Sequence, residues 1–198
     1  MKWKPVNNLY LAIICALVLI ACNSDYTVKR RGYFAIDFPK HEYQVFNKPG
    51  YPYTFEFPVY ASVIQDTTFF EDKPENPYWI NIDFPRFNAK IYVSYKEIGK
   101  NKFDDLIKDA FNLTYKHVSK ASDIRDSLMH TKMGITGIFF QAEGDVATAK
   151  QFFVTDSVKH FLRGALYFDA TPNADSLGVV NDFLQADMKH LINTLKWK

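Results

Sequence analysis

Residues 155–160 bring the residue types of a serine hydrolase together within six positions. Ser157 could act as a nucleophile, His160 as a general base and Asp156 as the group that orients the base. Such triads, however, are assembled from residues far apart in the sequence, and Asp and Ser side chains commonly bond their own backbone in turns. We therefore expect a hairpin turn here and keep hydrolysis as an alternative.

Other motifs of catalysis and cofactor binding do not occur in the sequence. The eight glycines form neither the GxGxxG nor the GxxxxGK[ST] loop that cradles phosphates, and no GxSxG nucleophile elbow is present. The histidines never show the HxH or HxxxH spacing of metal ligands; they are His41, His117, His130, His160 and His190. We expect no enzymatic activity, no metal, no cofactor and no small-molecule substrate.

The N-terminal residues 1–21 have the layout of an export signal. Lys2 and Lys4 form a short positive region, and an apolar run follows over residues 9–21. The run has the roughly 7–15 residues of a signal-peptide core and falls short of the roughly 20 residues that a spanning helix needs. An uncleaved membrane anchor and an ordinary signal peptide are the alternatives.

The end of this apolar run resembles the lipobox of bacterial lipoproteins. A branched apolar residue stands at −3, a small residue at −1, and a cysteine follows: Leu19, Ile20, Ala21 and Cys22. The resemblance implies that lipoprotein signal peptidase cleaves before Cys22. It also implies a diacylglycerol thioether on the sulfur and an N-acyl chain on the new amine. Several acyl chains, at about 0.8 kcal/mol per buried methylene, anchor far more firmly than one chain.

The mature chain would be neutral and without a thiol. Cys15 leaves with the signal and Cys22 is acylated, so we expect no disulfide and no cysteine-ligated metal. Without Lys2 and Lys4 the chain has as many basic as acidic residues. A neutral domain lacks the electrostatic footprint of a nucleic-acid-binding protein.

Residues 22–31 form the lipidated tether. No Asp follows Cys22, so the inner-membrane retention signal known from some gram-negative bacteria is missing, and no acidic run directs the chain to the cell surface. We therefore expect anchoring in the outer membrane, on its periplasmic face. The ten tether residues reach at most about 35 Å. Lys29, Arg30 and Arg31 either contact anionic headgroups or lie in solvent.

Residues 32–198 are expected to form one globular domain. Aromatic and β-branched runs broken by Pro, Gly and Asn predict strands at 33–38, 53–57, 60–65, 79–84, 89–96, 135–142, 151–155 and 161–169. Apolar residues at three- and four-residue spacing predict helices at 102–120 and 176–195, the second capped by Asp175 or Ser176. The prediction is an α+β fold, an antiparallel sheet covered by two amphipathic helices. Its architecture resembles the PsbP-like α-β-α sandwich.

Aromatic residues offer both core and surface candidates. Tyr51, Tyr53, Phe55 and Phe57 alternate onto one face, which favours burial in the core over a ligand pocket. Residues 66–77 read as an acidic, proline-punctuated loop. Exposed aromatics are enriched at interfaces, so a partner surface is predicted from this loop and the 155–160 run: Phe69, Phe70, Trp79, Asp156, Ser157 and His160.

Residues 36–40 (IDFPK) and 82–86 (IDFPR) have nearly the same sequence. They are either two strand ends, each terminated by a proline, or an internal duplication.

Long motifs of the mature chain resemble the gliding-motility lipoprotein family GldD. They lie at residues 32–39 (GYFAIDFP), 51–56 (YPYTFE), 79–85 (WINIDFP), 113–118 (LTYKHV), 155–168 (TDSVKHFLRGALYF) and 194–198 (TLKWK). Residues 144–149 depart from the pattern, since Gly-Asn followed by small residues is expected there.

This resemblance implies a non-enzymatic outer-membrane lipoprotein that is needed for gliding and for the linked type IX secretion system. Its implied partners are other gliding and secretion lipoproteins and outer-membrane components. No catalytic residues come with the family, so only Cys22 has a defined role. The alternative is a periplasmic module that binds a lipid or another apolar ligand between the sheet and a helix.

Overall fold

Strands that alternate buried and half-buried residues build a central sheet, as in β5 (Ala89–Glu97), where every second side chain is buried. The computed structural model describes residues 10, 35–68, 73–116 and 120–198. Within it, residues 36–198 form one compact unit, which carries all the elements discussed below. In the described part of the chain, no helix has both the length and the apolar run that a membrane crossing needs.

The central sheet has seven antiparallel strands in the order β3-β4-β5-β9-β8-β7-β6. Their bounds in chain order are β3 Ser62–Gln65, β4 Ile80–Phe84, β5 Ala89–Glu97, β6 Ala121–His130, β7 Thr136–Gly144, β8 Lys150–Thr155 and β9 His160–Phe168. The short 3-10 helix η1 (Pro85–Phe87) joins β4 to β5. A smaller antiparallel sheet has the order β1-β2-β10, with bounds Tyr43–Phe46, Tyr53–Pro58 and Lys196–Trp197.

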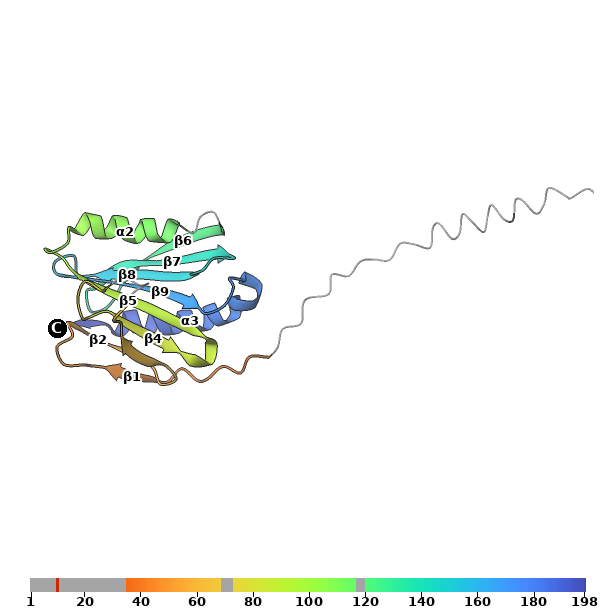
Figure 1. Ribbon diagram of the computed structural model, residues 1–198, viewed down its shortest axis with the longest axis horizontal. Coiled ribbons are helices and arrows are strands. Elements are labelled where there is room, and N and C mark those ends of the chain that lie inside the picture. Colours follow the sequence, from red (N-terminus) through yellow and green to blue (C-terminus); the bar gives the residue numbers. More distant parts are fainter. Residues whose placement is uncertain (1–9, 11–34, 69–72, 117–119) are drawn as a thin grey trace, which may run out of the picture. The chain divides into compact units, whose positions relative to one another are not determined.

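Two helices cover opposite faces of the seven-stranded sheet. Helix α2 (Phe103–Tyr115) packs against aromatic residues of β7, β8 and β9, namely Phe140, Phe153 and Phe161. Helix α3 (Ala174–Thr194) packs on the other face together with the small sheet (Figure 1). The fold is therefore α+β with antiparallel sheets and two helices, as predicted.

The larger core lies between α3, the small sheet and the seven-stranded sheet. The aromatic residues predicted for the core are buried there: Tyr51, Tyr53, Phe55 and Phe57. Leu184, Met188 and Ile192 of α3 are fully buried against them. Side chains of α3 and of the small sheet thus pack directly on the seven-stranded sheet.

Four strands and one cap differ from the sequence prediction. Residues 35–38 are not a strand; Phe38 instead stacks on Phe183 of α3, with ring centroids 4.4 Å apart. Strands β1, β6 and β10 were not predicted. Asn173, not Asp175 or Ser176, caps α3, because its side chain accepts a hydrogen bond from the backbone N–H of Ser176.

The two echoing segments have different structures, so they are not a structural duplication. Residues 82–84 end β4 before η1, whereas residues 36–40 have no regular structure. The segments do touch, because Arg86 Nη2 lies 3.0 Å from Asp37 Oδ2.

Candidate functional site

Several residues singled out by sequence lie outside the described residues. They are the lipobox positions and the first two loop aromatics: Leu19, Ile20, Ala21, Cys22, Phe69 and Phe70. The proposed lipid attachment at Cys22 therefore stays a prediction from sequence.

Trp79 was wrongly placed on a partner surface. Its side chain belongs to the large core and only 8% of the residue is exposed. The indole Nε1–H donates to the carbonyl oxygen of Tyr95 at 2.8 Å. Trp79 is therefore a packed core residue whose one polar atom is satisfied within the fold.

The predicted hairpin turn is confirmed between β8 and β9. One carboxylate oxygen of Asp156, Oδ1, accepts hydrogen bonds from the backbone N–H groups of Val158, Lys159 and His160 at 2.9–3.0 Å. Burial opposes ionisation of this carboxyl, but the three backbone donors outweigh it and lower the pKa of Asp156. Ser157 has a positive φ of 61° in the same turn. The Asp and Ser side chains thus occupy a turn rather than an assembled triad.

His160 was also wrongly assigned to the partner surface, because only 4% of it is exposed. Its Nδ1 lies 2.7 Å from the hydroxyl oxygen of Tyr95, and its ring stacks on Trp197 of β10 with centroids 4.8 Å apart. Burial lowers the pKa of His160, although Asp156 partly opposes the shift. The ring links β9 to the C-terminal strand.

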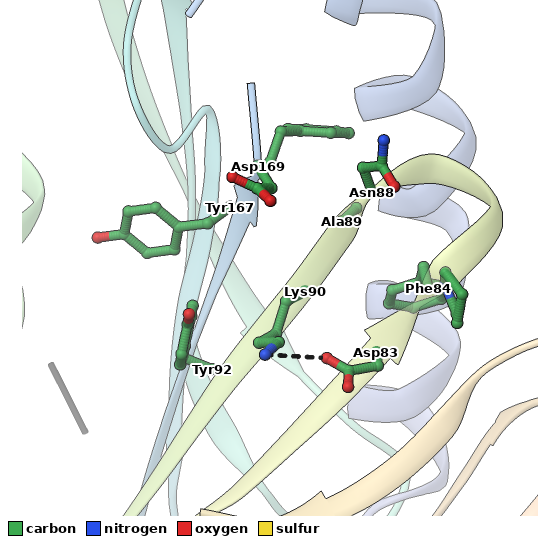
Figure 2. Close-up of a pocket in the computed structure, with 10 residues that line it drawn as sticks. Asp83, Phe84, Asn88, Ala89, Lys90, Tyr92, Tyr167 and Asp169 are labelled. Atoms are coloured by element: carbon green, nitrogen blue, oxygen red, sulfur yellow. Dashed lines mark ion pairs between the residues drawn. The ribbon is translucent and has the colours of Figure 1, made fainter. Parts of the chain in front are cut away.

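A groove of about 540 Å³ opens on the α2 side of the central sheet, over the end of the β4-β5 hairpin. It is lined by residues of β4, η1, β5 and β9 and of the turns next to them: Asp83, Phe84, Pro85, Asn88, Ala89, Lys90, Tyr92, Tyr167, Phe168 and Asp169. Figure 2 shows the polar and aromatic members together. Helix α2 packs on β7, β8 and β9. The groove lies on another part of the same face, at β4, β5 and the end of β9.

The alternation of β5 creates this groove. Ile91 and Val93 point into the core, so Lys90 and Tyr92 point to the opposite face. Lys90 Nζ lies 3.3 Å from Asp83 Oδ1 of the neighbouring strand. Tyr92 and Tyr167 meet edge to face, with ring centroids 5.5 Å apart. The sequence feature that could have indicated this site is Tyr92, an aromatic residue on the face of β5 opposite the core.

A second polar cluster surrounds a buried carboxylate on α3. The side chain of Asp187 is 1% exposed and accepts hydrogen bonds from three groups. The donors are His41 Nδ1 at 2.7 Å, the Tyr43 hydroxyl at 3.0 Å and the Tyr60 hydroxyl. Burial and the nearby Asp187 carboxylate raise the pKa of Tyr43 to about 12. The cluster holds the segment around His41, which follows the tether, against the C-terminal helix.

Stacked rings extend this cluster along α3. His41 stacks on Phe183 with centroids 4.4 Å apart, and Tyr43 stacks on His190 at 3.5 Å. His190 Nε2 in turn lies 2.7 Å from Glu56 Oε2 of β2. Among the described residues, no group of three or more His, Cys, Asp or Glu side chains is arranged to hold a metal ion. The hydrogen bonds and stacked rings of the cluster connect the segment around His41, β1 and β2 to α3.

Comparison with solved structures finds a similar chain. The solution structure of cyanobacterial PsbP (CyanoP) from Synechocystis sp. PCC 6803 is 11% identical to this chain, with a TM-score of 0.46. The match covers 86% of this chain and 99% of that one. Comparison with curated proteins gives no significant match.

The sequence profile described as gliding motility lipoprotein GldD matches residues 23–197. The match spans the tether, both sheets and both helices, and it starts directly after Cys22. The chain therefore belongs to the gliding motility lipoprotein GldD family.

Proposed function

We propose that this lipoprotein is anchored in the outer membrane, on its periplasmic face, by the acyl chains on Cys22. The folded domain acts there as a non-enzymatic factor that assembles or stabilises the gliding machinery and the linked type IX secretion system. The observation that carries this proposal is the family match over residues 23–197. The lipobox that ends at Cys22 supplies the anchor.

The fold supports a role in binding proteins close to the membrane. The segment that follows the tether is held on α3 through His41, Tyr43 and Asp187. The chain from Cys22 to His41 spans at most about 65 Å, so the domain stays near its anchor. Its partners are other gliding and secretion lipoproteins and outer-membrane components.

Affinity capture from crosslinked membranes tests this proposal. A tag joined by a flexible linker after Lys198 recovers the acylated protein, and the companions are identified by mass spectrometry. The matched control is the Cys22→Ala protein, expressed at the same level. Gliding or secretion components should be enriched with the acylated protein only. Capture of none of them, together with normal secretion in a deletion strain, would overturn the proposal.

A further inference from the structure

The groove that Figure 2 shows occupies part of one face of the central sheet. The pairing of β5 with β9 places Tyr92 opposite Ala165 and Lys90 opposite Tyr167 on this face. Gln151 of β8 marks the border with the helix, because Thr114 of α2 donates to its side-chain oxygen at 3.4 Å. We propose that this groove is a binding site for a neutral saccharide.

The two tyrosines provide the apolar part of such a site. The tilt of 83° between Tyr92 and Tyr167 gives the groove two aromatic surfaces in different orientations. Sugar rings carry C–H groups on their faces, and these pack well on aromatic rings, which are negative at the face. The hydroxyl of a tyrosine can both donate and accept hydrogen bonds.

The polar groups favour a ligand that has both donors and acceptors and no net charge. Lys90 and Asp83 neutralise one another across 3.3 Å, so the centre of the groove has no excess of either sign. Asp169 at the rim is exposed and would repel an anion. A cation would meet Lys90. Hydroxyl groups, in contrast, can donate to Asp83, accept from Lys90 and do either with Asn88.

Two buried acceptors next to the groove have no hydrogen-bond donor within the described structure. The side-chain oxygen of Asn81 is buried and accepts no hydrogen bond within the described structure. Asn81 lies beside the groove and not in its lining, two residues before Asp83 on β4 and opposite Tyr92 in the strand register. Asp83 Oδ1 also lacks a hydrogen-bond donor and has only the ion pair with Lys90. Buried acceptors in native proteins are nearly always paired.

The size of the groove fits a small saccharide. Its volume of about 540 Å³ falls within the range of about 300–1,000 Å³ found for small-ligand sites. The inference is independent of the anchoring role, because saccharide binding and acylation of Cys22 can be lost separately.

Saturation-transfer difference NMR on the full acylated chain tests the site. The protein is kept in lauryldimethylamine oxide micelles, since maltoside and glucoside detergents carry sugar headgroups that would compete. The neutral probes are maltotriose, cellotriose and N-acetylchitotriose, and the charged probes are trigalacturonate and the chitosan trimer. At least one neutral trimer should give a saturable signal stronger than either charged trimer.

Variants locate the binding on the sheet face. Tyr92→Ala should weaken binding about tenfold through the lost ring contact, and Tyr115→Ala, which removes an exposed tyrosine from α2, should leave it unchanged. Tyr92→Phe and Tyr167→Phe keep the packed rings and should weaken binding a few-fold through lost hydroxyl bonds. Thermal melting checks that each variant is folded. Absence of binding by all neutral trimers, preference for a charged trimer, or undiminished binding by the folded tyrosine variants would overturn the proposal.

Discussion

Replacing Asp187 with Asn should destabilise the domain by about 3 kcal/mol. The carboxylate is almost fully buried and accepts from His41, Tyr43 and Tyr60. Hydrogen bonds to a charged group contribute about 1.5–3 kcal/mol each, and neutral ones about 0.5–1.5. An amide of the same shape therefore loses about 1 kcal/mol at each of the three bonds.

Urea unfolding of the mature chain measures this loss, with Cys22 replaced by Ala so that no detergent is needed. With a slope of about 2 kcal/mol per molar urea, the midpoint should fall by about 1.5 M. The matched control is Asp182→Asn on the same helix, where the side chain is 76% exposed and pairs with Lys150 at 3.3 Å. Asp182 is hydrated when unpaired, and the buried Lys150 keeps Gln141 Oε1 as a hydrogen-bond partner at 3.3 Å. The control should therefore lose about 1 kcal/mol at most, and its midpoint should fall by about 0.5 M or less. Equal midpoints for the two variants would refute the stabilising role of the buried carboxylate.

Two further predictions concern the same domain. Because the pKa of Tyr43 rises from the ordinary 10.0 to about 12 on folding, its contribution to stability is complete below pH 10 and is lost as the pH rises towards 12. Unfolding free energies across this range check it, and a Tyr43→Phe protein with the same alkaline loss would contradict it. A methyl group on Gly137 of β7 would meet the backbone of Phe153 and Val154, so Gly137→Ala should cost about 1–3 kcal/mol. Gly178→Ala on α3 has no atom within 4 Å and should stabilise the domain by about 0.5–1 kcal/mol; urea midpoints that move in the same direction would contradict this contrast.

Elements with a regular apolar pattern were predicted from sequence close to their observed bounds. The strand predicted at 89–96 is β5 at Ala89–Glu97, and the helix predicted at 176–195 is α3 at Ala174–Thr194. Strand β6 escaped prediction because it is an edge strand with mostly exposed residues, so neither face requires an apolar pattern. Residues 35–38 have the composition of a strand, but Phe38 is held by ring stacking rather than by strand pairing.

The candidate sites were harder to predict than the fold. Sequence reasoning correctly interpreted Asp156 as a turn residue, whose partners lie within four positions. It could not find the Asp187 cluster, because His41 and Asp187 are 146 positions apart and meet only through tertiary packing. Trp79 and His160 were misplaced for a related reason, since an amphipathic side chain gives no sign in sequence of whether its polar atom faces water or a buried partner.

The central claim is that acyl chains on Cys22 hold this domain where it supports gliding and secretion. Metabolic labelling with radioactive palmitate, in a deletion strain complemented with either wild type or Cys22→Ala, tests it most directly. We predict that the wild-type protein is labelled and restores colony spreading and secretion. The Cys22→Ala protein should be unlabelled and restore neither. An unlabelled wild-type protein, or a Cys22→Ala protein that restores both functions, would contradict the account.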